Sequence, residues 1–316
     1  MNSRSSSFGP TDLLLLMTIG LWAINFTVVK TIISGDLPPI AFTALRFTLA
    51  TIGMLLVMRS FRDEQPLTRR DVLKMAGLGL LGNGLYQVMF IIGIDNTSLT
   101  NSALILASSP IFVAIFGALF KIERLTALAW FGIVLSFVGI AIVIFGNAPT
   151  DQLTDQPGKN ILLGDVLSLG AAIAWGAYTI LVAPVVQHHS PIRVSAISIM
   201  FGTIPLVLLA TPTFLTLDWS KVGLNSWLGV LYSGGLAIAV GYVLWNRGVR
   251  HIGSARTAVY SNLNPVLAAI IAFFVRGDAL TIYHLIGAVV ILAGIALTRL
   301  GRSQVMIEIE PEPIEG

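Results

Sequence analysis

Two pairs of residues near the centres of long apolar segments combine an aromatic ring with a polar group. Asn25 follows Trp22 by three residues, and Tyr178 follows Trp175 by the same interval. Residues three apart lie on one face of a helix, and helical rise places both tryptophans about 15 to 18 Å into their segments. These faces predict the wall of a binding cavity, because an indole offers an apolar surface and a cation–π partner for an ammonium group. Ordinary helix packing is the alternative.

Other polar side chains occupy the middle of apolar segments, where an unpaired polar group is costly. Their amides and hydroxyls can bind a zwitterion or form hydrogen bonds between helices. Arg46, about 10 Å deep, needs a substrate carboxylate, helix-end carbonyls or water as a partner, whereas Lys30 is expected to extend its ammonium to the interface. The predicted substrate-binding residues are Trp22, Asn25, Arg46, Tyr86, Gln87, Ser108, Trp175, Tyr178, Tyr242, Asn262 and Asn264, and Asn83, Ser109 and Tyr260 also lie at mid-segment.

Pro110 and Pro265 also fall in mid-segment, where proline removes a backbone hydrogen bond. We predict kinks or gating hinges there, with helix packing as the alternative. No catalytic residue, metal site or cofactor is expected, since the chain has no Cys and its four His lie at loops or segment ends. An intramembrane enzyme is therefore the least favoured function class.

The elements that must position these residues are apolar helices. Of the 316 residues, 55% are hydrophobic and 11% are charged, which excludes an ordinary soluble enzyme, and the net charge of +3 disfavours a nucleic-acid partner. A membrane helix needs roughly 20 apolar residues. Ten such segments are predicted, at 12–33, 39–58, 72–94, 99–120, 126–146, 163–186, 192–211, 224–246, 255–275 and 282–300. The predicted fold is thus an all-α integral membrane protein with the lipid bilayer as its surroundings.

The distribution of basic residues predicts the orientation. If the N-terminus is inside, the inner segments hold most of the 19 Lys and Arg residues, as cytoplasmic segments of membrane proteins do. Both termini are therefore expected to be cytoplasmic. Residues 301–316 alternate acidic, apolar and proline residues and are expected to form a disordered cytoplasmic tail.

The two halves of the chain repeat one another. Each half has five predicted segments, an odd number, so the second half must enter the membrane with opposite polarity. The predicted organisation is a first repeat at 1–146, a polar external linker at 147–162 and a second repeat at 163–300. The matches are Gly93 with Gly248, Pro110 with Pro265, Thr126 with Thr281, Gly132 with Gly287 and Gly139 with Gly294 at an offset of 155, and Asp12 with Asp165 and Trp22 with Trp175 at 153.

Several stretches resemble the EamA-type repeat of the drug/metabolite transporter superfamily. In the first half they are Trp22-Ala23-Ile24-Asn25-Phe26-Thr27-Val28-Val29-Lys30, Ala44-Leu45-Arg46-Phe47, and Pro110 followed by Glu123-Arg124-Leu125-Thr126 and Gly132. Trp175, Pro265 and Leu280-Thr281 repeat the pattern, but Ile197-Ser198 replace Leu45-Arg46, so Arg46 is not duplicated. The resemblance implies a ten-helix exporter of metabolites or amino acids in the bacterial inner membrane, most similar to exporters of aromatic amino acids.

The sixteen acidic residues all fall in loops, in tails or at segment ends, and only His284 lies about one turn inside a segment. Proton-coupled pumps usually place a titrating group within the membrane. We therefore expect uncoupled facilitated diffusion of a small neutral amino acid by alternating access. A carrier of organic cations or organophosphates is the alternative. The repeated glycines can pack within one chain or across a homodimer, which leaves the oligomeric state open.

Overall fold

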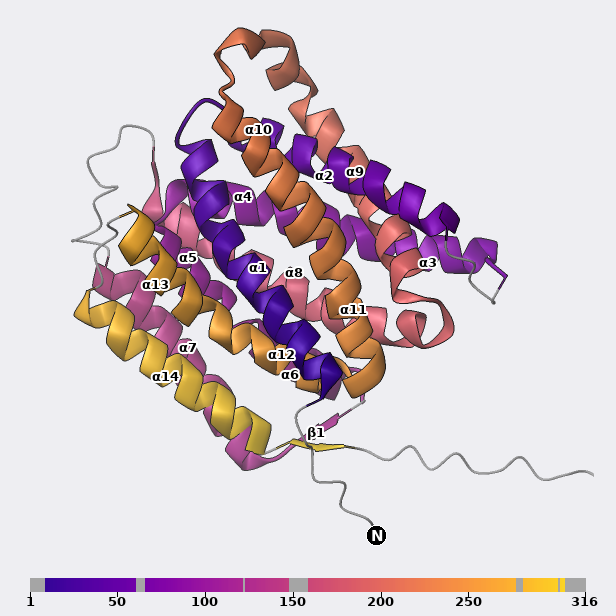
Figure 1. Cartoon of the computed structure of the whole chain (residues 1–316). Helices are drawn as coiled ribbons and strands as arrows, with labels where there is room; N and C mark the ends of the chain where they lie inside the picture. Colours follow the sequence, from indigo (N-terminus) through magenta and orange to yellow (C-terminus); the bar gives the residue numbers. More distant parts are fainter. Residues whose placement is uncertain are drawn as a thin grey trace, which may run out of the picture.

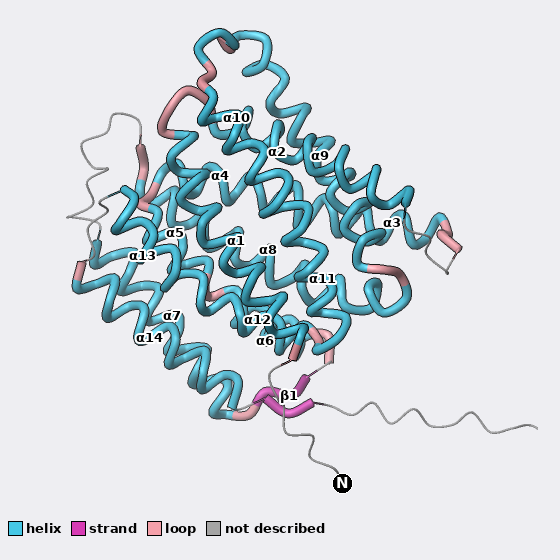
Figure 2. Tube along the Cα trace, viewed as in Figure 1, coloured by secondary structure: helices cyan, strands magenta, loops and turns pink. Residues whose placement is uncertain are grey.

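The computed structural model describes residues 9–60, 66–121, 123–147, 159–276, 281–300 and 302–304, and the side chains of a few of these, Asn262 and Pro265 among them, fall outside the description. These residues form a bundle that is almost entirely helical (Figures 1 and 2). Within the described residues, seven helical segments are long and apolar enough to cross a membrane, and two shorter apolar helices accompany them. The all-helical membrane architecture is confirmed, while the count of ten spans and the location of the termini stay predictions.

The segments of the two halves follow one another in the same order. In the first half they are α1 (Pro10–Ile33), α2 (Pro39–Ser60), α3 (Arg69–Gly79) continued by η1 (Leu80–Leu85) and α4 (Tyr86–Asn96), α5 (Leu99–Leu106) with α6 (Ser109–Leu119), and α7 (Ala127–Asn147). In the second half they are α8 (Ile161–His188), α9 (Pro191–Thr216), α10 (Leu224–Leu231) continued by η4 (Tyr232–Val240) and α11 (Gly241–Ile252), α12 (Ser254–Tyr260) with η5 (Ser261–Leu263) and α13 (Asn264–Arg276), and α14 (Ile282–Leu300), with a short 3₁₀ turn, η3 (Trp219–Lys221), before α10.

Both halves depart from regular α-helix at equivalent places. The π-helical segments η1 and η4 interrupt the third segment of each half, and the fourth segment breaks after α5 in one half and at η5 in the other. Pro110 and Pro265 each stand in the first turn after the break. Proline is well tolerated there because first-turn N–H groups have no partner within the helix. The prolines therefore follow a break and do not kink a continuous helix, and their role as hinges stays a prediction.

The packing of the helices is reciprocal between the halves. Helix α1 contacts α11 and α13, and its counterpart α8 contacts α4 and α6; α2 packs against η4 and α9, and α9 against η1 and α2. The end of α1 and the beginning of α8 both lie against the end of α4, because Lys30 Nζ donates to the Ile94 carbonyl and the Asn160 N–H donates to Asn96 Oδ1. The first helices of the two halves thus run in opposite directions, as the odd number of segments predicts.

A short antiparallel sheet departs from the expected organisation. Residues 302–304, expected to belong to the disordered tail, form β2 (Arg302–Gln304), which pairs with β1 (Glu123–Leu125) in the expected inter-helix turn. Because α7 and α14 run antiparallel side by side (Figure 1), the start of α7 and the end of α14 meet at one end of the bundle. Their flanking backbones can therefore pair. The rest of the tail, 305–316, lies outside the described residues.

Close packing of α7 on α14 depends on glycine. A Cβ added at Gly132 would lie 2.5 Å from the Gly294 carbonyl oxygen, and one at Gly139 would lie 2.8 Å from the Ile291 side chain. These glycines thus pack within the chain. At Gly53 of α2, by contrast, an added Cβ meets nothing within 4 Å.

Gly132→Ala is expected to separate α7 from α14, because the new methyl group collides with backbone that cannot rotate away. The expected cost is about 1 to 3 kcal/mol of overpacking, measured as a loss of thermal stability in detergent by fluorescence-detected size exclusion. Gly53→Ala is the matched control and should leave stability unchanged or slightly raised. Equal stability of the two variants would contradict this packing.

Candidate functional site

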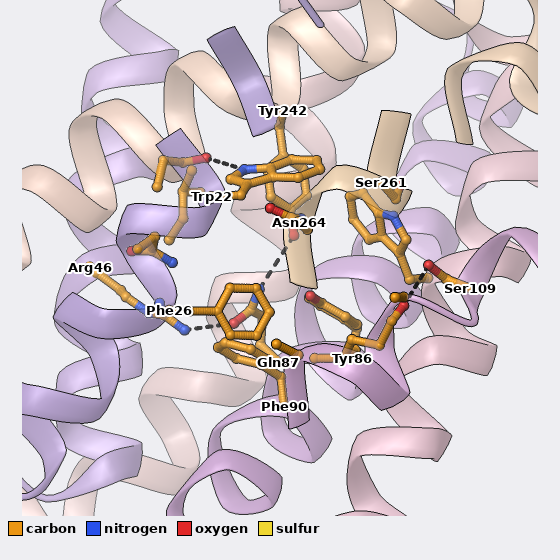
Figure 3. Close-up of a pocket in the computed structure, with 17 residues that line it drawn as sticks. Trp22, Phe26, Arg46, Tyr86, Gln87, Phe90, Ser109, Tyr242, Ser261 and Asn264 are labelled. Atoms are coloured by element: carbon orange, nitrogen blue, oxygen red, sulfur yellow. Dashed lines mark hydrogen bonds between the residues drawn. The ribbon is translucent and has the colours of Figure 1, made fainter. Parts of the chain in front are cut away.

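A cavity lies where helices of both halves meet (Figure 3). Its volume is about 60 Å³, room for only a few water molecules, so a larger ligand requires the walls to move. The described lining side chains come from seven of the helical segments, and no Asp, Glu or His is among these described residues. They are Trp22, Asn25, Phe26, Arg46, Tyr86, Gln87, Phe90, Ala103, Leu106, Ala107, Ser109, Trp175, Ala237, Ile238, Tyr242, Ser261 and Asn264.

Residues at equivalent positions of the two halves meet in this cavity. The rings of Trp22 and Trp175 are edge to face, with centroids 5.4 Å apart. Gln87 Nε2 donates to the hydroxyl oxygen of its counterpart Tyr242 at 3.4 Å. Ser109 and Asn264, which correspond at the offset of 155, both line the cavity. The cavity therefore lies at the interface between the repeats.

Six of the seventeen described lining residues are aromatic, and their rings form one connected cluster. Trp175 is at the centre of this cluster and contacts the rings of Trp22, Tyr86, Tyr178, Tyr242 and Trp245 at centroid distances of 5.2 to 5.5 Å. The indole N–H of Trp22 donates to the carbonyl of Ala237 in η4 at 2.8 Å, which fixes the ring (Figure 3). Edge-to-face and offset pairs of this kind stabilise a cluster beyond the apolar area that they bury. The wall thus presents a rigid apolar surface to a ligand.

Arg46 brings a positive charge into this apolar wall. Its side chain is only 1% exposed; Nη1 donates to Ser233 Oγ at 3.0 Å and Nη2 to Gln87 Oε1 at 2.7 Å, while Nε has no partner. Among the described residues no carboxylate forms an ion pair with this guanidinium. A buried charge without a counter-charge is costly. The rings of Phe42, Phe47 and Phe90 also lie near the guanidinium, with centroids 5.3 to 5.8 Å from its carbon.

Three further polar atoms of the lining are buried without a partner in the described structure: Asn25 Oδ1, Asn264 Oδ1 and Ser261 Oγ. Buried polar atoms are nearly always hydrogen-bonded. The residues that line the cavity therefore include a guanidinium with one unpaired N–H, at Arg46, and three side-chain oxygens without a partner in the described structure. This arrangement complements a ligand that carries both an anionic and a donor group.

Eight of the eleven predicted binding residues line the cavity: Trp22, Asn25, Arg46, Tyr86, Gln87, Trp175, Tyr242 and Asn264. Two others do not. The Ser108 hydroxyl donates to the Ile105 carbonyl at 2.6 Å, as serines near a helix break often do, and Tyr178 lies behind Trp175, with its hydroxyl hydrogen-bonded to Asn246. The side chain of Asn262 lies outside the described residues.

Sequence reasoning did not select Phe26, Phe90, Ser109 or Ser261 as binding residues. A signal was present for three of them. Phe26 and Phe90 follow Trp22 and Tyr86 by four residues and so share their faces, and Ser109 is the repeat counterpart of Asn264. Ser261 corresponds to an apolar residue, Leu106, in the other half, so neither helical spacing nor the repeat could identify it.

Paired polar contacts close the two ends of the bundle. At one end His189 Nε2 lies 3.4 Å from Asp71 Oδ2, which joins the α8–α9 connection to the start of α3. At the other end Asp36 accepts from the Gly223 N–H and the Ser226 hydroxyl, which joins the α1–α2 connection to the start of α10. These two donors also lower the pKa of Asp36, so that its carboxylate remains charged at neutral pH. The two contacts occupy equivalent positions in the repeats.

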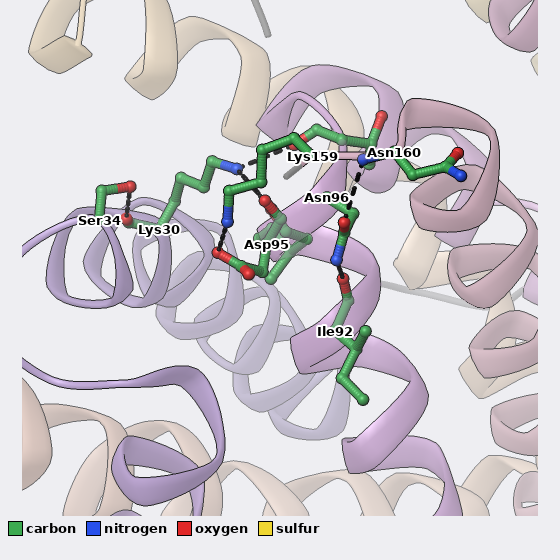
Figure 4. Close-up of polar contacts among 9 residues, drawn as sticks. Lys30, Ser34, Ile92, Asp95, Asn96, Lys159 and Asn160 are labelled. Atoms are coloured by element: carbon green, nitrogen blue, oxygen red, sulfur yellow. Dashed lines mark hydrogen bonds and ion pairs between the residues drawn. The ribbon is translucent and has the colours of Figure 1, made fainter. Parts of the chain in front are cut away.

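The Lys30 ammonium, unlike the Arg46 guanidinium, has backbone carbonyls as partners. The expectation that it extends to the interface is wrong, because its side chain is 5% exposed and its ammonium caps the end of α4 (Figure 4). Nζ donates to the carbonyls of Ile94 at 2.5 Å and Thr97 at 2.9 Å, while the neighbouring Asp95 carboxylate pairs with Lys159 at 2.6 Å. A cation is favourable at the negative end of a helix dipole. Three backbone carbonyls at the end of α4 therefore accept from the Lys30 ammonium, whereas one N–H of Arg46 has no partner among the described residues.

This contrast predicts unequal effects of removing the two charges. Arg46→Met should cost little thermal stability in the substrate-free protein in detergent, because the loss of the donors to Gln87 and Ser233 is offset by the removal of a buried charge that has no carboxylate partner in the described structure. Lys30→Met should lower thermal stability, since the carbonyls at the end of α4 lose their donor, at about 1 to 3 kcal/mol for each unsatisfied group. A loss of stability in Arg46→Met as large as that in Lys30→Met would show that Arg46 has a structural role.

Comparison with known proteins agrees with this architecture. The EamA-like transporter family matches the chain twice, over residues 9–145 and 162–300. An uncharacterized transporter of Bacillus subtilis, YyaM, is 26% identical over 83% of this chain and 84% of its own length. A probable amino-acid metabolite efflux pump of Escherichia coli is 27% identical over 91% of this chain and 94% of its own. A crystal structure that is 20% identical shares the fold with a TM-score of 0.62, covering 93% of this chain and 99% of that one. The chain therefore belongs to the EamA-like transporter family and is a multi-pass membrane transporter.

Proposed function

We propose that the protein exports small amino acids with aromatic or other neutral side chains across the bacterial inner membrane. The observation that carries this proposal is the uncompensated guanidinium of Arg46 in a cavity lined by aromatic rings. A positive charge held without a protein counter-charge favours a ligand with one anionic group, and the rings favour a ligand with an apolar body. An amino acid supplies both.

The two charged groups of an amino acid have complementary partners at the cavity wall. Its carboxylate would accept from Arg46, whose Nε is unused, in the bidentate geometry that guanidinium groups favour. Its ammonium would donate to Asn25 Oδ1 and Asn264 Oδ1, both unused in the described structure. The faces of Trp22 and Trp175 add cation–π attraction and a surface for the side chain.

The names of two relatives support this substrate class. Proteins of Escherichia coli and Salmonella typhimurium, 27% and 26% identical to this chain, are named probable amino-acid metabolite efflux pumps. The sequence resemblance to aromatic amino-acid exporters points in the same direction. The aromatic cluster around Trp175 gives that preference a physical basis, since aromatic pairs stabilise one another by about 0.5 to 1.5 kcal/mol beyond area burial.

Alternating access follows from the repeat. The first helices of the halves run in opposite directions, and the contacts Asp71–His189 and Asp36–Ser226 close opposite ends. Opening one end of the bundle would separate one of these contacts and leave the other intact. The helices would bend at the irregular positions of the third and fourth segments of each half. On this account both termini face the cytoplasm.

Transport is proposed to be uncoupled facilitated diffusion. The cavity lining contains no Asp, Glu or His, so no group at the described site is suited to exchange a proton with each substrate. The buried Asp165 and His284 belong to a different network, in which Thr97 donates to Asp165 at 2.6 Å and Asn101 contacts His284 at 2.9 Å. That network lies toward the helix ends, outside the cavity wall.

The alternative substrates fit the cavity less well. An organic cation would be repelled by Arg46, and a phosphate dianion would need several convergent cations, whereas Arg46 is the only Lys or Arg in the described lining. A substrate with one carboxylate and one ammonium group is the best match to this charge pattern.

Counterflow in proteoliposomes tests the proposal with phenylalanine and two analogues, phenethylamine, which lacks the carboxylate, and 3-phenylpropionate, which lacks the ammonium. Phenylalanine should be transported equally with and without a pH gradient, and phenethylamine should not be transported. Arg46→Gln should reduce phenylalanine transport about 10-fold or more, since a hydrogen bond to a charged group contributes about 1.5 to 3 kcal/mol.

The matched control is Arg59→Gln, which removes an exposed cation at the end of α2, far from the cavity wall. Transport of phenethylamine as fast as phenylalanine would contradict the role of the carboxylate. Proton movement in fixed ratio to phenylalanine would contradict facilitated diffusion.

A further inference from the structure

A second hollow of about 660 Å³ lies on the surface between α3 and α8, separate from the central cavity. Residues spaced by three and four line it from both helices: Lys74, Gly77, Leu78 and Leu81 on one side, Leu181, Pro184, Val185 and His188 on the other. This spacing means that one face of each helix is turned toward the other. We call this hollow the α3–α8 groove.

The α3–α8 groove has the dimensions and polarity of one leaflet of a bilayer. From Thr68 to Leu81 the wall runs about 20 Å along the helix, compared with about 15 Å of hydrocarbon and a headgroup layer in one leaflet. The polar residues of the groove lie near the start of α3 and the end of α8, and Leu78, Leu81 and Leu181 lie closer to the middle of the two helical segments. An apolar hollow facing lipid is filled by lipid chains, since no water is available at that depth.

The end of the groove at the start of α3 is positively charged. Lys74 is exposed and forms no ion pair with the residues that the structure describes, and Arg69 and Arg70 precede it in the first turns of α3. The one acidic side chain of the groove, Asp71, is already engaged by the Thr68 hydroxyl at 2.6 Å and by His189. The groove therefore offers a free ammonium directly above an apolar channel.

We propose that the α3–α8 groove binds an anionic phospholipid, with its phosphate at Lys74 and an acyl chain against Leu78, Leu81 and Leu181. The equivalent hollow at the other end of the bundle supports this specificity by contrast. It is bounded by Asp36 and Ser226, and no Lys or Arg belongs to its described lining. A lipid at the α3–α8 groove contacts a helix of each half, so it lies across the repeat interface, whichever substrate the central cavity carries.

Native mass spectrometry of the purified full chain tests this proposal with two probes of matched acyl chains, phosphatidylglycerol and phosphatidylcholine. Wild type should retain phosphatidylglycerol at least about 10-fold more strongly, since a charged hydrogen bond is worth about 1.5 kcal/mol or more. Lys74→Gln should abolish that preference. Gly77→Phe should fill the channel and reduce retention of both lipids, and it is tolerable because an added Cβ at Gly77 meets nothing within 4 Å.

The matched controls are Arg59→Gln, an exposed cation on α2, and Gly53→Phe, which also has nothing within 4 Å of an added Cβ. Both should bind lipid as wild type does, and all variants are first compared by size exclusion and thermal stability. Equal retention of the two lipids by wild type, or a preference that survives Lys74→Gln, would overturn the proposal. Unchanged retention in a folded Gly77→Phe protein would place the lipid elsewhere. These readouts do not depend on amino-acid transport, so the two proposals can fail separately.

Discussion

The unpaired buried charge of Arg46 is the constraint on which the site depends. A guanidinium that is 1% exposed and faces no carboxylate in the described structure must obtain its stabilisation from Ser233, Gln87 and three aromatic rings. These contacts tie α2 to α4 and η4, so the charge is held by elements of both halves. Neutral partners compensate a charge only partly. An anionic ligand would form an ion pair with Arg46, and the site would thereby favour substrates that carry a carboxylate.

The repeat explains why such a site lies at the centre of the bundle. Trp22 meets Trp175, and Gln87 meets Tyr242, because equivalent residues of inverted halves approach one another at their common interface. The same symmetry places π-helical segments in the third segment of each half and breaks in the fourth. Irregular backbone is stable in a membrane protein where it is buried or lines a cavity. Arg46 has no repeat counterpart, so it gives an otherwise symmetric cavity one charged side.

Much of this arrangement could be predicted from residue types and spacing. Trp22 and Trp175 at equivalent mid-segment positions indicated the cavity, whereas Pro110 and Pro265, for which kinks or hinges are predicted, lie in the first turn after a helix break. Periodicity could not separate Ser108 from Ser109, because both hydroxyls donate to a carbonyl three residues earlier and only Ser109 lines the cavity. The burial of Lys30 depends on α4 ending beside α1, and β2 depends on the end of α14 lying beside the start of α7. Contacts of this kind join distant segments and leave no local pattern in the sequence.

The central claim is that the substrate carboxylate pairs with Arg46, and the most direct measurement is a structure of the protein with 4-bromophenylalanine bound, with the bromine located by anomalous scattering. The account predicts carboxylate oxygens within hydrogen-bonding distance of Arg46 Nε or Nη, the ammonium beside Asn25 and Asn264, and the bromine against the aromatic cluster around Trp175. An amino acid bound with its carboxylate away from Arg46, while the guanidinium keeps only its contacts to Ser233 and Gln87, would contradict it.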